Sequence, residues 1–247
     1  MRLCIVVPMY NEAALARESI MMILSYTRQL SIVATVVVVD DGSHDATRTI
    51  VDSLVHEVGD TEKLILVAHE HNRGYGAALR TGMHYAIDHG FDYVVYMDSD
   101  LTNHPKYLTL FCDKMLEGYD YIKATRYAPG GGMEGVPWKR QMMSRWGNRV
   151  ARVLFGLPLT DITNGFRALK VSLAAKLQLT ESGFPIMMEE LYQVQALTRS
   201  FAEVPYILTS RQAWQGTTHF GYDLSTLSTY LYYALKSFLS RIYGRTK

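Results

Sequence analysis

The chain has 247 residues, of which 48% are hydrophobic and 20% charged, and its formal net charge at pH 7 is +1. This length fits one large domain, or one domain with an appended segment, and it allows a substantial core. A nearly neutral chain is not expected to bind nucleic acid. No window approaches the roughly 18 uncharged apolar residues of a membrane span. The apolar run after Arg2 stops at Pro8, so no signal peptide is predicted. Cys4 and Cys112 form no spaced framework, which indicates a reducing compartment.

Short apolar runs alternate with helical stretches over the first half of the chain. Runs that are apolar throughout are typical of parallel strands buried on both faces. The repeated strand and helix order predicts an α/β protein with a mostly parallel, twisted sheet flanked by helices. The expected strands are Leu3–Val7, Thr35–Val39, Lys63–Ala68, Tyr93–Met97 and Tyr121–Thr125. The expected helices are roughly Ala13–Leu30, Ala46–Val58, Ala77–His89 and Pro105–Glu117.

Polar groups follow four of these strands, at the edge where open α/β sheets bind ligands. They are the segments Pro8–Glu12, Asp40–Ser43 and Asp98–Asp100 and the side chain of Arg126. Two carboxylates about 4 Å apart repel by roughly 4 kcal/mol at an effective dielectric near 20. The aspartate pair of the third segment therefore requires a divalent cation, a shared proton or arginines nearby. Because neither a P-loop nor a complete dinucleotide fingerprint is present, a nucleotide would be bound through carboxylates and a metal.

Six motifs follow one another in the order and spacing of a known family. They are "IVVPMYNE", "VVVVDDGSHDAT", "NRGYGAALRTG", "MDSDLTNHP", "ATRY" and "DITNGFRA". With these motifs the chain resembles the family 2 glycosyltransferases of GT-A fold over residues 3 to about 211, and above all the dolichyl-phosphate mannose synthases and bacterial polyprenyl-phosphate glycosyltransferases. The resemblance implies inverting, metal-dependent transfer of a mannose-like or glucose-like sugar. The implied donor is a GDP- or UDP-linked sugar, and the implied acceptor is a polyprenyl or dolichyl phosphate.

The resemblance also implies roles for individual residues. Asp98 and Asp100 would hold Mg²⁺ or Mn²⁺ on the diphosphate, with Thr102 as a third candidate ligand. Arg126 and Arg211 would face phosphates. The expected catalytic residues are Asp98, Asp100 and Arg126. The nucleotide sugar is expected to contact Pro8, Tyr10, Glu12, Val39, Asp41, Asp98, Ser99, Asp100, Arg126 and Arg211.

Two positions depart from the family pattern. Many relatives carry Gln two positions after the second aspartate, where this chain has Thr102, and a hydroxyl is a weaker ligand for hard cations. The family follows its late arginine with Gly-x-Ser-Lys, whereas the corresponding segment "RQAWQGTTHF" contains no lysine. Either the chain has no positive group there, or protonated His219 supplies it.

The acceptor decides whether the reaction needs a general base. A phosphate is already an anion at neutral pH and needs none, whereas a hydroxyl does. The spare carboxylates for that role are Asp161 and the pair Glu189 and Glu190, although Asp161 fits a turn or helix cap equally well. The alternative to a polyprenyl phosphate is therefore a soluble or polymeric hydroxyl acceptor.

A function of another class is also open, namely a non-catalytic nucleotide-binding module or a nucleotidyltransferase. A nucleotidyltransferase is expected to carry a glycine-rich loop with a basic residue after its first strand. The segment "VPMYNEAA" has neither. The intact Asp-x-Asp pair argues against a module without turnover.

The segment 138–170 holds seven basic residues and the single acid Asp161. On a helix, Arg145, Arg149 and Arg152 share one face, while an apolar row that includes Trp146 shares another. Such a helix is typical of a membrane-surface segment, and the alternative is a helix docked on the sheet with a solvated basic face. The apolar row is Met143, Trp146, Val150 and Val153. The residues expected to face the acceptor phosphate or membrane are Arg140, Arg145, Arg149 and Arg152.

The C-terminal segment also reads as an amphipathic helix. We expect a GT-A catalytic domain over residues 1–220 and this helix over residues 221–247. Its apolar stripe predicts packing on the core, a homo-oligomer contact or membrane contact. A lipid acceptor with no predicted span suggests a cytoplasmic protein, peripheral at the cytoplasmic face of a membrane, alone or with a membrane-anchoring partner. The stripe is Leu224, Leu227, Leu231, Leu235, Phe238 and Ile242.

Overall fold

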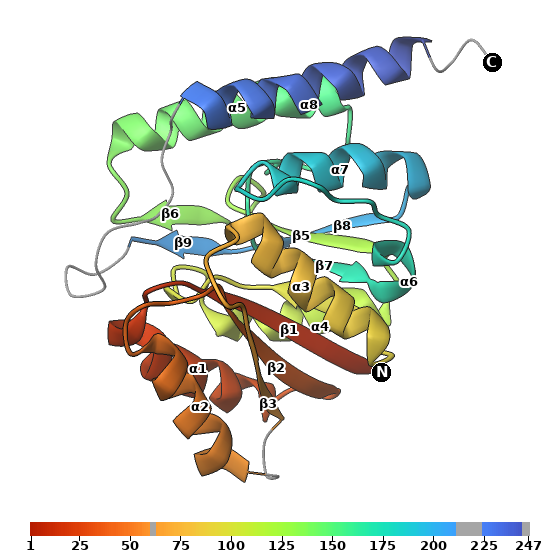
Figure 1. Cartoon of the computed structure of the whole chain (residues 1–247). Coiled ribbons are helices and arrows are strands. Elements are labelled where there is room, and N and C mark those ends of the chain that lie inside the picture. Colours follow the sequence, from red (N-terminus) through yellow and green to blue (C-terminus); the bar gives the residue numbers. More distant parts are fainter. Residues whose placement is uncertain (60–62, 211–223, 244–247) are drawn as a thin grey trace.

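A seven-stranded sheet forms the centre of the computed structural model, which describes residues 1–59, 63–210 and 224–243 (Figure 1). The strand order is β3-β2-β1-β4-β7-β5-β8, and only β7 runs antiparallel to its neighbours. A separate ribbon pairs β6 (Gly132–Glu134) with β9 (Ile207–Thr209). The strands of the main sheet are β1 (Arg2–Met9), β2 (Val33–Asp40), β3 (Leu64–Ala68), β4 (Tyr93–Tyr96), β5 (Tyr121–Thr125), β7 (Arg167–Lys170) and β8 (Phe201–Pro205).

Helices cover both faces of this sheet. They are α1 (Ala13–Thr27), α2 (Thr47–Val58), α3 (Tyr75–Asp88), α4 (Leu108–Leu116), α5 (Trp138–Phe155), α6 (Val171–Ala174), α7 (Ile186–Leu197) and α8 (Leu224–Tyr243). The first face carries α1, α2 and α4, and the second carries α3, α6 and α7. The helices α5 and α8 contact each other and lie outside α7 as an outer layer (Figure 1).

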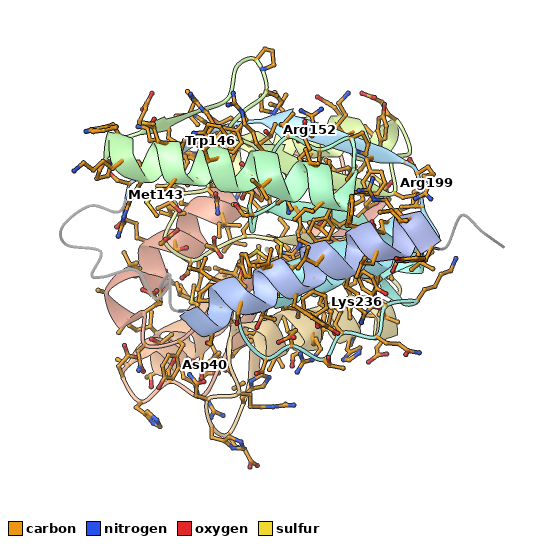
Figure 2. The ribbon with its side chains drawn as sticks, turned by 90° about the horizontal axis from the view of Figure 1, so that it is seen from above. Asp40, Met143, Trp146, Arg152, Arg199 and Lys236 are labelled. Atoms are coloured by element: carbon orange, nitrogen blue, oxygen red, sulfur yellow. The ribbon has the colours of Figure 1, made fainter. Side chains whose placement is uncertain are left out.

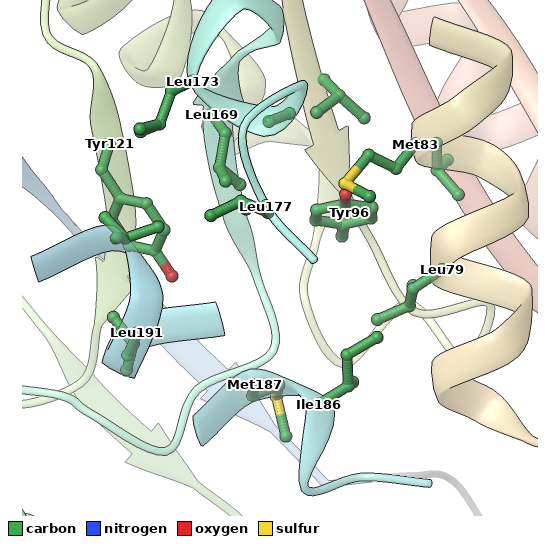
Figure 3. Close-up of a cluster of buried hydrophobic side chains, with 14 of the residues drawn as sticks. Leu79, Met83, Tyr96, Tyr121, Leu169, Leu173, Leu177, Ile186, Met187 and Leu191 are labelled. Atoms are coloured by element: carbon green, nitrogen blue, oxygen red, sulfur yellow. The ribbon is translucent and has the colours of Figure 1, made fainter. Parts of the chain in front are cut away.

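The alternation of side chains along β1 explains the two hydrophobic cores. Successive residues of a strand point to opposite faces, so Val6 joins the core under α3 and α7 while Val7 joins the core under α1 and α4. Strands buried on both faces must be apolar throughout, which is why β1 and β2 read as continuous apolar runs. Figure 3 shows the first of these cores, in which Leu79 of α3 and Ile186 of α7 lie close together.

The predicted α/β class and its mostly parallel sheet are confirmed. The five predicted strands all occur, with ends that differ by at most two residues, and the four predicted helices occur too. The last of these begins with a 3₁₀ turn, η2 (Pro105–Tyr107), before α4. The antiparallel strand β7 was not predicted, because "RALK" contains two cations and is not an apolar run. Arg167 is nevertheless fully buried, because Glu190 pairs with it at 2.5 Å.

None of the helices that the structure describes is both long and apolar enough to cross a bilayer. The predicted boundary between residues 1–220 and 221–247 falls within 211–223, outside the described residues. The described part of the predicted C-terminal helix is α8.

Candidate active site

The carboxyl ends of β1, β2 and β4 are hydrogen-bonded neighbours at one edge of the sheet. The backbone N–H of Asp41 donates to the carbonyl of Met9 at 2.8 Å, and the register places Pro8 opposite Val39. The loops that follow β1 and β2 are also joined, since the N–H of Asn11 donates to the hydroxyl of Ser43 at 2.9 Å. The predicted nucleoside-binding segments therefore lie side by side.

Tyr10 and Glu12 lie on this joined pair of loops. The ring of Tyr10 meets His44 edge-on, with 6.4 Å between centroids. Glu12 is 7% exposed, and its backbone N–H donates to the hydroxyl of Thr47 at 2.8 Å. Both residues predicted to contact the nucleotide sugar therefore lie on the loop after β1, which is hydrogen-bonded to the loop after β2.

The two aspartates that end β2 have different surroundings. The carboxylate of Asp41 contacts Nδ1 of His69 at 2.6 Å and accepts the backbone N–H groups of Arg73 and Gly74 at 3.0 and 2.8 Å. Asp40 is fully buried, and neither of its carboxylate oxygens has a hydrogen-bond partner among the described residues. Burial of an unpartnered carboxylate is costly, and the structure offers no described group that offsets this cost at Asp40. Asp40 belongs to the polar segment predicted after β2 but not to the predicted nucleotide-sugar contacts, since two adjacent aspartates give the same sequence signal.

Asp98 and Asp100 lie on the half-buried loop after β4. Asp98 accepts the hydroxyl of Tyr75 at 3.2 Å and the amide of Asn103 at 2.9 Å. Asp100 accepts the backbone N–H and the hydroxyl of Thr102 at 3.1 and 2.7 Å. Burial and the carboxylate of Asp98 raise the pKa of Tyr75 well above its usual value, which keeps that hydroxyl a donor. These contacts orient both carboxylates.

The oxygen atoms of this loop suit a hard divalent cation such as Mg²⁺ or Mn²⁺. Two carboxylates and the oxygen of Thr102 are the donors, while Ser99 between them is 5% exposed. Residues 1–59, 63–210 and 224–243 contain no group of three or more His, Cys, Asp or Glu that could enclose a metal. The candidate donors for a cation among the described residues are the carboxylates of Asp98 and Asp100 and the hydroxyl of Thr102.

Arg126, directly after β5, is held by Asp161. Its Nε and Nη2 donate to the two carboxylate oxygens at 2.6 and 2.8 Å, and its backbone N–H donates at 3.1 Å. Asp161 is fully buried, and the side chain of Arg126 is 12% exposed. Burial alone would lower the pKa of Arg126, but the carboxylate outweighs it and the pKa is raised, so the guanidinium stays charged. Among the described residues Nη1 has no hydrogen-bond acceptor, which leaves it for a ligand.

The segment 160–166 connects Arg126 with the aspartate pair. A Cβ placed on Gly165 would lie 3.7 Å from Oδ2 of Asp98. The ammonium of Lys123 donates to the carbonyl of Asn164 at 2.7 Å, and Glu203 accepts the backbone N–H of Thr160 at 2.5 Å. This segment is therefore held from several sides next to the candidate metal site.

The carboxylates considered as spare bases are all engaged. Asp161 pairs with Arg126, and Glu190 pairs with Arg167. Glu189 is 4% exposed and accepts the backbone N–H of Thr180 at 2.9 Å, together with two further donors of the same turn. The interpretation of these three carboxylates as spare is therefore wrong. Arg211 and His219, the other predicted phosphate-facing positions, lie outside the described residues.

The helix α5 exposes both of its predicted faces. Met143, Trp146 and Val153 are 64%, 61% and 69% exposed, so the interpretation that this apolar row docks on the sheet is wrong. The only buried residues of α5 are Asn148 and Phe155. Figure 2 shows Met143, Trp146 and Arg152 along the helix. The four arginines expected on this surface are also exposed, namely Arg140, Arg145, Arg149 and Arg152.

The helix α8 packs through small and aromatic residues rather than through its leucine stripe. Tyr233, Ala234 and Ser237 are buried, whereas Leu231 is 51% exposed. The interpretation of the stripe as core packing is therefore wrong. Since α5 and α8 run side by side, their exposed apolar residues form one surface, which we call the outer face (Figure 2). It comprises Met142, Met143, Trp146, Val150 and Val153 of α5, and Leu227, Leu231, Leu235, Leu239 and Ile242 of α8.

Comparison with known proteins decides the family. The family model for glycosyl transferase family 2 matches residues 4–178. The chain belongs to glycosyl transferase family 2. The polyprenol monophosphomannose synthase of Mycolicibacterium smegmatis is 29% identical over 214 residues, which cover 85% of this chain and 78% of that protein. The undecaprenyl-phosphate mannosyltransferase of Micrococcus luteus is 31% identical over 216 residues, covering 86% of this chain and 85% of that protein.

A solved structure confirms the GT-A fold of this family 2 glycosyltransferase. The glucosyl-3-phosphoglycerate synthase of Mycobacterium tuberculosis, in complex with Mn²⁺, UDP-glucose and phosphoglyceric acid, superposes with a TM-score of 0.64. It is 21% identical, and the match covers 97% of this chain and 79% of that chain. With its family and its mannosyltransferase relatives, the protein is a hexosyltransferase. The interpretations as a nucleotidyltransferase or a non-catalytic module are therefore set aside.

Proposed function

We propose that this family 2 glycosyltransferase moves a mannosyl group from a GDP- or UDP-linked donor to a polyprenyl phosphate, with inversion. The names of both curated relatives support mannose and a polyprenol-linked acceptor. The observation that carries the proposal is the site itself. An Asp-x-Asp pair and an arginine that a buried carboxylate holds in place are connected by the segment 160–166, and each carboxylate considered as a base is already engaged.

The donor side is built from the ends of β1, β2 and β4. Pro8 and Val39 would form the wall on which the nucleoside rests, with Tyr10, Glu12 and Asp41 around it. A divalent cation held by Asp98 and Asp100 supplies, when bound, positive charge that stabilises the leaving nucleoside diphosphate. Thr102, Tyr75 and Asn103 keep these two carboxylates oriented.

The acceptor side would be built around Arg126, which is expected from sequence among the contacts of the nucleotide sugar and is here assigned to the acceptor phosphate instead. The fork of Arg126 is occupied by Asp161 through Nε and Nη2, so the charged guanidinium would offer Nη1 to a phosphate oxygen. A phosphate oxygen of the acceptor would attack the anomeric carbon, and the bond to the diphosphate would break. No proton has to be removed from a phosphate nucleophile at neutral pH, so no side chain is needed as a base.

The outer face would lie on the membrane that contains the acceptor. An apolar surface with tryptophan and flanking arginines is typical of helices that rest in a lipid interface. The arginines of α5 would meet anionic head groups, and the protein would act as a peripheral protein at the cytoplasmic face. The alternative occupants of the outer face are a membrane-anchoring partner and a second copy of this chain. Flotation with vesicles, compared with the mass of the protein in solution, separates these cases.

A transfer assay with matched donors tests the proposal. Purified protein is incubated with undecaprenyl phosphate in vesicles, Mn²⁺, and labelled GDP-mannose, UDP-mannose, GDP-glucose or UDP-glucose in turn. We expect a labelled lipid with one mannose donor, and none when a chelator replaces the metal. Absence of lipid product with all four donors, with the protein folded and bound to vesicles, would contradict the proposal.

A further inference from the structure

The single buried polar residue of α5 connects the outer face to the site. Asn148 is 2% exposed, on a helix whose apolar row is turned to the outside. A buried amide is retained only where its hydrogen bonds are made. The role of Asn148 must therefore be sought in its partners.

The side chain of Asn148 is bonded to the segment that carries Asp161. Its Oδ1 accepts the backbone N–H groups of Ile162 and Thr163 at 2.7 and 3.0 Å. Its Nδ2 donates to the hydroxyl of Thr163 at 3.0 Å and to the carbonyl of Ser144, one helical turn back, at 2.9 Å. One side chain thus ties α5 to two consecutive residues of another segment.

Two short routes lead from Asn148 to the guanidinium of Arg126. The hydroxyl of Thr163 also accepts Nη2 of Arg126, at 3.3 Å. Ile162 is the next residue after Asp161, whose carboxylate holds the same guanidinium. A third contact joins α5 to the residue after Arg126, because the hydroxyl of Ser144 on α5 lies 2.6 Å from the hydroxyl of Tyr127. If α5 moves, Arg126 must therefore move with it, or these hydrogen bonds must break.

We propose that Asn148 is a positioning residue that transmits the seating of α5 on a lipid surface to Arg126. The inference rests on the proposed function, in which the outer face meets the membrane and Arg126 meets the acceptor phosphate. When α5 settles on the surface, the hydrogen bonds of Asn148 fix the position of the helix relative to the segment 160–166, and Nη1 of Arg126 takes the position that binds phosphate. Away from the surface, the apolar row of α5 is uncovered, and a movement of the helix reaches Arg126 through the same bonds.

Hydrogen exchange of the backbone amides measures the coupling between α5 and the segment 160–166, and it does not require that the enzyme turns over. The protein is measured with and without vesicles of equal parts phosphatidylglycerol and phosphatidylcholine. We expect the vesicles to slow exchange in wild-type peptides covering residues 160–166. The Asn148→Ala variant should bind to the vesicles as wild type does, but the vesicles should no longer slow hydrogen exchange in residues 160–166. The matched control is Gln141→Ala, which removes a different side-chain bond of α5, from the amide to the carbonyl of Val136, and should respond as wild type does.

Kinetics provide the second readout. With a polyprenyl phosphate in the same vesicles, Asn148→Ala should lower kcat by about tenfold or more, while the affinity for the nucleotide sugar stays unchanged. Thr163→Val, which removes only the shared hydroxyl and conserves volume, should lower kcat in the same direction and decides the matter if Asn148→Ala does not fold. Wild-type exchange over 160–166 that is indifferent to vesicles, or wild-type protein that does not bind them, would overturn the inference. Vesicle-dependent protection without any sugar transfer would instead sink the proposed function and leave the coupling standing.

Discussion

Replacement of Asp161 by Asn should destabilise the protein strongly, because it breaks a buried ion pair from one side. Asp161 is fully buried, and it accepts three hydrogen bonds from Arg126, of which two come from the charged guanidinium. Asn keeps one acceptor oxygen and turns an amide N–H₂ toward the guanidinium. Removal of one partner of a buried pair costs about 3–5 kcal/mol. With an m-value of about 3 kcal/mol/M, the urea midpoint should fall by about 1–1.7 M.

Urea titration followed by circular dichroism measures this shift. Asp113→Asn, at an exposed position of α4, serves as the control and should leave the midpoint within about 0.2 M of wild type, as surface changes usually do. A loss of less than about 1 kcal/mol in Asp161→Asn would refute the reasoning that the pair is buried and essential to the segment. The pH dependence of kcat distinguishes Asp161 as an anchor of Arg126 from Asp161 as a general base. If Asp161 anchors Arg126, the variant should lose kcat by a similar factor from pH 6 to pH 9, whereas loss of a base would remove one limb of the pH profile.

Three further predictions concern the metal, the membrane and a buried amine. Calorimetry should show that nucleotide-sugar affinity falls at least tenfold with a chelator or in Asp100→Asn, and equal affinity in all conditions would count against a metal role. Replacement of Arg145, Arg149 and Arg152 by Gln should weaken binding to anionic vesicles by roughly a hundredfold, at about 1 kcal/mol per residue, and unchanged flotation would speak against this surface. Burial lowers the pKa of Lys123 to about 7, so between about pH 7 and 10 the unfolded chain binds more protons than the folded one and stability should rise with pH. Urea midpoints at pH 7 and pH 9.5 should show this rise in wild type and less of it in Lys123→Met; an identical rise in both would contradict it.

The elements that could be predicted from sequence are those in which each residue type follows from local surroundings. Strands such as β1 and β2 are buried on both faces and must be apolar, so a run of apolar residues identifies them. β7 could not be predicted in this way, because Arg167 is buried through a partner 23 residues away on α7. The burial of a charged residue depends on tertiary pairing, and periodicity carries no signal of it.

In the candidate site, too, local sequence indicates some residues, whereas others depend on partners that are distant in the chain. Asp98 and Asp100 could be proposed as site residues because two carboxylates at the end of a buried strand have no role in packing, and their metal role stays a prediction. The partner of Arg126 could not be assigned, because Asp161 lies 35 residues further along the chain and looks like an ordinary turn residue. The amphipathic pattern of α5 was visible, but whether its apolar row faces the protein or the outside depends on what α7 and α8 already cover.

In the proposed reaction a phosphate, rather than a hydroxyl, receives the sugar. Two acceptors that differ only in this group, undecaprenyl phosphate and undecaprenol, test it most directly when each is offered in the same vesicles with Mn²⁺ and the preferred donor. We predict a labelled product with undecaprenyl phosphate and none with undecaprenol, and the same selectivity in Glu189→Gln. Equal transfer to both lipids, or transfer that disappears in folded Glu189→Gln, would show that a hydroxyl acceptor and a catalytic base are at work and would contradict the account.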